Sequence, residues 1–253
     1  MAAIRSFQHS PGRSLDRAKN ALDRDRIVET IMENTAHETA VYEVTGSAEG
    51  PTAVILGGMH GNEINGYRVA ANITSWDIDA GRLVVIPFAT ILAIERNDRR
   101  GPDGDLNRSF PSEQPPESAL ARAIWRVITD ADPDVVIDLH RSRGLFNTHH
   151  RWVGQVILHT EANRATDTAT DVCRSMNDHY VPRLMRFHRF TPVAMDDIDR
   201  GTGLLIQKAQ HDLDVASYLV ESTDFLLDID TQIRWTATIT NLLLAEHGIQ
   251  RTA

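Results

Sequence analysis

The sequence predicts an α/β protein with a mixed, largely parallel central sheet that is flanked by helices on both faces. From about residue 50 onward, short and nearly continuous apolar runs alternate with longer mixed stretches. This is the pattern of buried parallel strands separated by crossover helices. A chain of 253 residues is long enough for one substantial core. We therefore expect residues 1–253 to form a single domain, with about the first 20 residues, which are polar, held only loosely.

Each element is expected for a local reason. Strands are expected where a short run is apolar and rich in β-branched residues, over 52–58, 82–88, 134–140, 154–160 and 215–222. Helices are expected in the mixed stretches, over 62–75, 117–130, 162–178, 203–212 and 230–247. Three irregular stretches rich in polar or turn-forming residues remain, 97–116, 141–151 and 191–203. Long loops in a compact domain are often functional, so the site is expected there.

Composition restricts the class of protein. The formal net charge of −9 argues against a nucleic-acid partner. No run of about 18 apolar residues is present, so no membrane span is expected. The first residues lack the apolar stretch of a secretory signal, so we expect a cytoplasmic protein. The single cysteine, Cys173, excludes an intrachain disulfide and a cysteine-rich metal site, whereas eleven histidines offer imidazole ligands.

A metal site is predicted from residues that follow two of the expected strands. His60 and Glu63 come directly after the strand 52–58 and the pair Gly57-Gly58, and their spacing of three places both side chains on one side of a first helical turn. His140 ends the strand 134–140, so it emerges at the same carboxyl edge of the sheet. Two imidazoles and one carboxylate leave a coordination position open for water, as in catalytic zinc sites. We expect one zinc ion.

The loop 97–116 carries candidates for binding a substrate. Arg108 offers a planar guanidinium that matches a carboxylate with two hydrogen bonds, and Asn107 adds an amide donor. Arg99 or Arg100 is expected to stabilise the oxyanion that forms when an amide carbonyl is attacked. The alternative for these arginines is ion pairing with the aspartates of the same loop. The expected substrate is a small molecule that bears a carboxylate.

Glu221 is the candidate for general base. It ends the apolar strand 215–222, where a glutamate is uncommon unless it pairs with another polar group or has a functional role. At the carboxyl edge of the sheet it would face the metal, take a proton from the attacking water and pass it to the leaving amine. The alternative is a carboxylate at the end of a strand that pairs with an arginine.

Taken together, these motifs resemble the zinc carboxypeptidase superfamily, and within it the succinylglutamate desuccinylase/aspartoacylase branch. The resemblance rests on GGMHGNE at 57–63, the pair Arg99-Arg100 with DGDLNRSFP at 103–111, IDLH at 137–140 and VES at 220–222. It implies one zinc ion on His60, Glu63 and His140, with Glu221 as general base and acid. It also implies Asn107 and Arg108 on the substrate carboxylate, with Arg99 or Arg100 polarising the scissile carbonyl.

The resemblance leaves the substrate open. Residues 222–253 suffice for one helix, so the C-terminal β-domain that narrows the aspartoacylase pocket is expected to be absent. Arg200 is a candidate specificity residue in the stretch 191–203. The expected reaction is hydrolysis of the amide bond of an N-acyl amino acid through metal-activated water. A metallocarboxypeptidase acting on short peptides and a non-catalytic metal-binding or amino-acid-binding module are the alternatives. The oligomeric state is not predicted.

Overall fold

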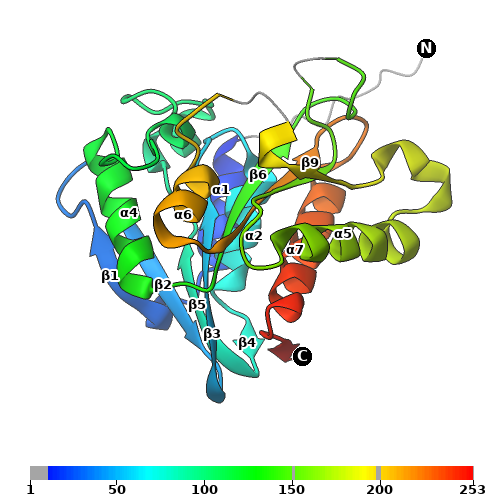
Figure 1. Cartoon of the computed structure of the whole chain (residues 1–253). Coiled ribbons are helices and arrows are strands. Elements are labelled where there is room, and N and C mark those ends of the chain that lie inside the picture. Colours follow the sequence, from blue (N-terminus) through cyan, green and yellow to red (C-terminus); the bar gives the residue numbers. More distant parts are fainter. Residues whose placement is uncertain (1–10, 150–151, 198–200, 253) are drawn as a thin grey trace, which may run out of the picture.

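The computed structural model describes residues 11–149, 152–197 and 201–252 and has three layers, with a central sheet between two layers of helices (Figure 1). The eight strands of the sheet have the order β1-β2-β5-β3-β6-β9-β7-β8. Their bounds are β1 (Ile27–Ile31), β2 (Thr39–Thr45), β3 (Ala48–Gly57), β5 (Ala80–Ile86), β6 (Val135–Ser142), β7 (Val156–His159), β8 (Thr191–Ala194) and β9 (Ala216–Thr223). A separate two-stranded ladder joins β4 (Asp77–Ile78) to β10 (Arg251–Thr252).

The centre of the sheet is parallel and its flanks are not. Strands β5, β3, β6 and β9 run in the same direction. Strand β2 pairs antiparallel with β5, β1 pairs antiparallel with β2, and β7 pairs antiparallel with β9. The carboxyl ends of β3, β6 and β9 therefore meet at one edge of the sheet, where open parallel sheets bind ligands.

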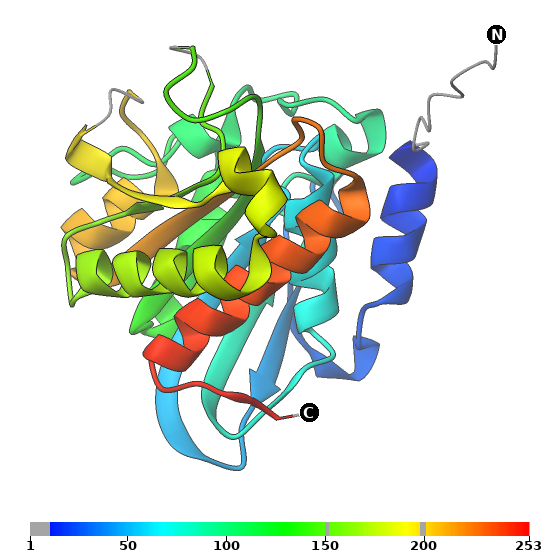
Figure 2. The same cartoon turned by 90° about the vertical axis from the view of Figure 1, so that its right-hand side faces the viewer.

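Helices cover both faces of the sheet (Figures 1 and 2). One face carries α2 (Ile64–Ile73), α5 (Ala165–Ser175) and α7 (Ile229–Glu246), and the other carries α4 (Ala119–Ala131) and α6 (Leu205–Leu213). The remaining helical segments are α1 (Pro11–Asn20), α3 (Ile91–Arg96), η1 (Arg24–Arg26), η2 (Leu106–Arg108), η3 (Met176–Tyr180), η4 (Arg183–His188) and η5 (Met195–Asp197). Within the described part of the chain, no helix combines the length and apolar character needed to cross a bilayer.

Strand alternation decides which side chains reach the site. Along β9, Tyr218 and Val220 enter the core beneath α5 and α7, whereas Leu219 belongs to a separate apolar cluster on the other face. Because successive side chains of a strand point to opposite faces, Glu221 lies on the same face as Leu219. The same alternation on β6 places His140 on this face.

The fold confirms the predicted class, a mixed and largely parallel sheet with helices on both faces. All five expected strands are present as β3, β5, β6, β7 and β9, and the five expected helices overlap α2, α4, α5, α6 and α7. Cys173 is a buried free thiol. The strands were predictable because their apolar runs are nearly continuous, as is typical of strands that are buried on both faces.

Three features of the rest of the chain differ from or add to the expectations. Of the first 20 residues, which were expected to be held loosely, residues 1–10 lie outside the described residues, and Pro11–Asn20 form a helix whose Leu15 and Ala18 pack into an apolar cluster with α2. The edge strands β1 and β2 are additional to the expected set. The stretch 191–203 is not wholly irregular, since it opens with β8 and η5.

Candidate metal centre and substrate pocket

The loop between β3 and α2 is held in place by glycines. Gly58 has a φ of +74°, a left-handed conformation that side chains rarely adopt. At Gly61 an added Cβ would lie 2.0 Å from the carbonyl carbon of Ala93, so only glycine fits against α3. Glu63 is the N-cap residue of α2 but makes no side-chain capping bond. The loop thereby presents His60 and Glu63 to the carboxyl edge of the sheet.

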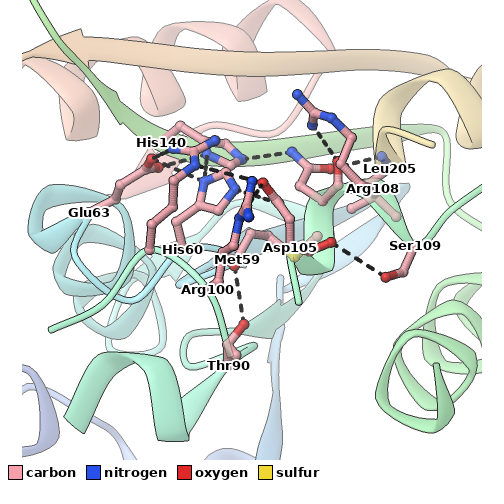
Figure 3. Close-up of polar contacts among 12 residues, drawn as sticks. Met59, His60, Glu63, Thr90, Arg100, Asp105, Arg108, Ser109, His140 and Leu205 are labelled. Atoms are coloured by element: carbon pink, nitrogen blue, oxygen red, sulfur yellow. Dashed lines mark hydrogen bonds and ion pairs between the residues drawn. The ribbon is translucent and has the colours of Figure 1, made fainter. Parts of the chain in front are cut away.

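His60, Glu63 and His140 meet there, as the sequence predicts (Figure 3). The two imidazole Nδ1 atoms are 3.1 Å apart. The Glu63 carboxylate touches both rings, with Oε1 3.0 Å from Nδ1 of His60 and Oε2 2.7 Å from Nδ1 of His140. All three side chains are buried. Strands β3 and β6 thus bring together three residues from two distant parts of the chain.

A second ring of carboxylates orients the two imidazoles. Nε2 of His60 lies 2.9 Å from Oδ1 of Asp105, and Nε2 of His140 lies 2.8 Å from Oδ2 of Asp138. An ionised carboxylate only accepts hydrogen bonds, so each imidazole donates its Nε2 proton outward. When both imidazoles are neutral, as metal binding requires, their Nδ1 lone pairs face each other, as in carboxylate–histidine–metal arrangements.

This donor set fits a divalent transition metal such as zinc. Zinc takes nitrogen and oxygen ligands at roughly 2.0–2.2 Å in tetrahedral geometry, which holds neighbouring ligand atoms about 3.3 Å apart. The separations between His60, Glu63 and His140 are 2.7–3.1 Å. Two inward-facing lone pairs at this distance repel one another unless a cation lies between them. The three residues leave coordination positions open toward the cavity.

The electrostatics of the cluster also favour a cation. Burial by itself lowers the pKa of His140, but the carboxylates of Asp138 and Glu63 raise the pKa well above its usual value. For His60 the carboxylates of Glu63 and Asp105 likewise outweigh burial and raise the pKa. Burial raises the pKa of Asp105, yet the hydrogen bond and charge of His60 bring it down to about 2. The site therefore carries excess negative charge that attracts positive charge.

Glu221 stands beside this cluster. Its Cα is the register partner of His140 in the parallel ladder between β6 and β9, and its side chain lines the same cavity as the three candidate ligands. Its Oε2 is buried and has no hydrogen-bond partner within the described part of the chain. Burial, and then the Glu63 carboxylate, raise the pKa of Glu221 to about 7. A carboxylate in this setting is suited to exchanging protons near neutral pH.

The structure separates the two candidate arginines. Nη1 of Arg99 donates to Oε1 of Glu63 at 2.8 Å, and Arg99 lines the cavity. By contrast, Nε of Arg100 lies 4.0 Å from Oδ2 of Asp105, and 70% of the Arg100 side chain is exposed. Of the two, only Arg99 is among the described residues that line the cavity.

Asn107 and Arg108 lie on η2 and line the cavity from the side of α6. Asn107 is buried, and its amide oxygen accepts the backbone N–H of Leu205 at 3.0 Å. Its amide nitrogen donates to Oδ2 of Asp138 at 3.3 Å. Asn107 thus lines the cavity and also links Asp138, which contacts the candidate ligand His140, to the start of α6. Nη1 of Arg108 donates to the carbonyl oxygen of Asn107.

The cavity formed by these groups has a volume of about 300 Å³. Besides the predicted residues, its lining contains a polar set and an aliphatic set: Asn62, Arg141, Ser142, Arg143 and Asp224, and Val153, Leu158, Leu204 and Leu219. A cavity of this size suits a small molecule. Arg200, the candidate specificity residue, lies outside the described residues.

Sequence reasoning missed Asp138, and it assigned Asp105 only to ion pairing within its loop. The spacing of Asp138 and His140 on one strand was an available signal, because residues two apart on a strand share a face. The aliphatic lining was not predicted, since it depends on the antiparallel register between β7 and β9.

Fold and site together define an α/β protein with a candidate mononuclear metal centre at the carboxyl edge of its sheet. Residues 49–195 match the model of the succinylglutamate desuccinylase/aspartoacylase catalytic domain. The match extends over more than half of the chain, so this protein belongs to that family. The resemblance seen in the sequence motifs is thereby confirmed.

Individual relatives are more distant. N-alpha-acetyl-L-2,4-diaminobutyric acid deacetylase of Halomonas elongata is 34% identical over 102 residues, which cover 36% of this chain and 29% of that protein. The tripeptide-bound cell shape determinant Csd4 of Helicobacter pylori superimposes with a TM-score of 0.72 at 18% identity, covering 85% of this chain and 57% of that one. The product-bound ectoine utilization protein EutE (DoeB) of Ruegeria pomeroyi gives 0.60 at 17% identity, covering 85% and 62%. These structural likenesses concern the fold, and the chain spans less than two thirds of each relative.

Proposed function

We propose that this protein is a zinc-dependent hydrolase that cleaves the amide bond of an N-acyl amino acid or a similar carboxylate-bearing substrate. The observation that carries this proposal is the convergence of the Nδ1 atoms of His60 and His140 with the Glu63 carboxylate, at separations of 2.7–3.1 Å beside Glu221. Membership of the desuccinylase/aspartoacylase family supports it. So does the likeness to a relative that is an N-alpha-acetyl amino acid deacetylase.

The metal would be held by His60, Glu63 and His140. When bound, zinc supplies Lewis acidity that polarises a carbonyl oxygen and makes water a stronger acid at neutral pH. Asp105 and Asp138 keep the two imidazoles in the tautomer that directs Nδ1 inward.

Glu221 would move the proton. Its Oε2, which has no hydrogen-bond partner among the described residues, accepts a proton from the attacking water and then delivers it to the nitrogen of the leaving amine. The proton therefore travels from the nucleophile to the leaving group through one carboxylate. The sheet register fixes Glu221 beside His140, so this transfer needs no rearrangement of the backbone.

Arg99 would stabilise the charge that develops on the carbonyl oxygen. Its guanidinium is already oriented by Glu63 and lines the cavity. A guanidinium placed where an oxyanion forms contributes most when its orientation is fixed beforehand. The position of Arg99 at the cavity and the exposure of Arg100 favour Arg99 for this role.

Arg108 and Asn107 would bind the carboxylate of the substrate. The guanidinium of Arg108 suits a carboxylate because it offers two parallel N–H donors. The amide nitrogen of Asn107 donates one hydrogen to Asp138 and lies 3.2 Å from Nε2 of His140. Because Nε2 of His140 carries its own proton toward Asp138, the second amide hydrogen can serve a substrate oxygen.

A carboxypeptidase acting on short peptides would use the same groups. One structural relative, Csd4 of Helicobacter pylori, is a D,L-carboxypeptidase. Its mDAP-bound structure superimposes with a TM-score of 0.70 at 17% identity. A non-catalytic binding module would have no use for a base beside the metal ligands. The two hydrolytic activities differ in what lies on the acyl side of the scissile bond.

The test is metal analysis followed by a substrate panel. We expect one zinc ion per chain after loading and dialysis, and hydrolysis of N-acetyl amino acids that a chelator abolishes and added zinc restores. Dipeptides serve as the comparison, since faster cleavage of dipeptides would favour the carboxypeptidase. Absence of zinc binding, or absence of hydrolysis across both panels, would refute the proposal.

A further inference from the structure

One wall of the cavity is aliphatic. Leu158 of β7, Leu219 of β9 and Leu204, which precedes α6, line it and belong to one apolar cluster, and Val153 packs against that cluster. Leu158 and Leu219 are register partners on neighbouring antiparallel strands, so their side chains are adjacent. No residue proposed for catalysis or carboxylate binding belongs to this wall.

The wall borders the proposed base. Leu219 precedes Glu221 by two positions on β9, so both side chains lie on the same face of the sheet. Asp224 follows Glu221 in the chain and also lines the cavity. Charged residues thus lie beyond Glu221 toward the end of the strand, and the leucines lie deeper in the sheet.

The wall also borders the proposed carboxylate site. The backbone of Gly203 packs so closely on Arg108 that an added Cβ would lie 2.4 Å from the Arg108 carbonyl oxygen. The N–H of Phe110 donates to the carbonyl oxygen of Gly203 at 3.0 Å. Leu204 is therefore held next to Arg108, and the aliphatic wall connects Arg108 with Glu221.

This arrangement assigns a place to each group of an amino acid. Its α-carbon carries a carboxylate, an amide nitrogen and a side chain. With the carboxylate at Arg108 and the nitrogen at Glu221, the side chain is directed to the wall that adjoins both. We propose, on the basis of the hydrolase function above, that Leu158, Leu204 and Leu219 form the side-chain subsite and select amino acids with aliphatic side chains.

The physical basis is desolvation. A leucine side chain buried on this wall leaves water and packs against apolar surface, which is favourable. An aspartate side chain in the same place loses its hydration and finds aliphatic carbon in exchange, which is costly. Discrimination between side chains in an apolar pocket is about 10-fold or more for each methylene that is well packed.

The first experiment compares kcat/KM for N-acetyl-L-leucine, N-acetyl-L-alanine and N-acetyl-L-aspartate on the zinc-loaded protein. We expect the leucine derivative to exceed the alanine derivative by at least about 10-fold and the aspartate derivative by about 100-fold. Equal or faster hydrolysis of the aspartate derivative would overturn the subsite while leaving the hydrolase function intact. Absence of hydrolysis of every derivative would instead count against the hydrolysis of N-acyl amino acids proposed above.

A binding measurement separates the two ideas further. Calorimetric titration of the free amino acids L-leucine and L-aspartate into the zinc-loaded protein reports the subsite without any turnover. Tighter binding of leucine supports the subsite even if none of the acetyl derivatives is hydrolysed. Tighter binding of aspartate contradicts it.

Substitutions locate the preference on the wall. Leu219→Ala should enlarge the subsite and raise the ratio of N-acetyl-L-phenylalanine to N-acetyl-L-leucine hydrolysis by about 10-fold or more, whereas Leu219→Met, which conserves volume, should change this ratio little. Leu184→Ala is the matched control, because Leu184 is 97% exposed and does not line the cavity. A ratio that stays constant in Leu219→Ala, with the native circular dichroism spectrum retained, would remove Leu219 from the subsite.

Discussion

His140 and Glu221 are register partners on the neighbouring parallel strands β6 and β9. The third proposed metal ligand and the proposed base are therefore neighbours through backbone hydrogen bonding and not through a flexible loop. Their strands contribute Val136 and Ser217 as a further register pair within the buried sheet. Rigid strands position catalytic groups more accurately than loops do.

Glu221→Gln tests the base. The amide is close to the carboxylate in size but cannot accept a proton from water, so we expect kcat to fall by about 10²–10⁴-fold. Zinc content should stay at the wild-type level, because Glu221 is not among the three candidate ligands. Turnover equal to that of the wild type would remove Glu221 from this role.

Asp105→Ala tests the outer ring of carboxylates. Loss of the Asp105 carboxylate releases the His60 imidazole, and we expect zinc affinity to fall by about 10–100-fold in competition with a chromophoric chelator. Asp103→Ala is the control in the same loop, because the Asp103 side chain is mostly exposed. Equal affinities in the two variants would contradict the orienting role.

Arg99→Ala and Arg100→Ala form a matched pair. Arg99 contacts Glu63 and lines the cavity, so its loss should lower kcat by about 100-fold. Arg100 is mostly exposed, and its loss should change kcat by less than about 3-fold. Steady-state kinetics with one substrate decide the matter, and a larger loss in Arg100→Ala would reverse the assignment.

Lys208→Met tests the support of the substrate loop. Nζ of Lys208 is buried and donates to the carbonyl oxygens of Pro111 and Gln114 and to Asp212. Removal of its charge takes away this donor from the carbonyl oxygens of Pro111 and Gln114 and leaves Asp212 with the N–H of Glu113, so we expect the free energy of unfolding in urea to fall by about 3 kcal/mol. Lys19→Met is the control, since Lys19 is the only other lysine and is exposed. Equal midpoints for both variants would contradict this account.

His247 should make stability depend on pH. Burial lowers the pKa of His247 below its usual 6.5, and Nε2 lies 2.9 Å from the hydroxyl of Tyr218. Burial raises the pKa of Tyr218, so this hydroxyl stays protonated and shares a hydrogen bond with the neutral imidazole. A folded pKa below the unfolded one means that the contribution of His247 is complete above pH 6.5 and is lost as the pH falls through the folded value.

The measurement is the urea midpoint of the wild type and His247→Gln between pH 7.5 and 5. The difference between the two proteins should shrink as the pH decreases. A difference that is constant, or that grows toward acid, would mean that the folded pKa of His247 is not lowered.

The sequence predicted those parts of the molecule whose local pattern is decisive. Val135, Val136 and Ile137 form a continuous apolar run that only a buried strand accommodates, and His60 and Glu63 follow a glycine pair that marks a turn. Edge strand β1 escaped prediction because Ile27 and Val28 remain exposed there.

The remaining features depend on tertiary register. Asp138 orients His140, but nothing in the local sequence says that the Asp138 carboxylate meets the outer nitrogen of that ring. Likewise, Leu158 and Leu219 become one surface only because β7 runs antiparallel to β9. Helix α1 escaped prediction because Leu15 and Ala18 are the only apolar anchors in a largely polar segment that pack into the cluster with α2.

Strand β9 carries the proposed base and, two positions earlier, a leucine of the proposed side-chain subsite. In evolution, such a strand allows the base at position 221 to be retained while the substrate specificity set at position 219 changes. On the proposals above, one substitution at position 219 would change which substrates are accepted, and the proposed base Glu221 would keep its place in the backbone ladder. Proteins descended from one ancestral hydrolase would therefore differ in substrate specificity while they keep the same catalytic mechanism.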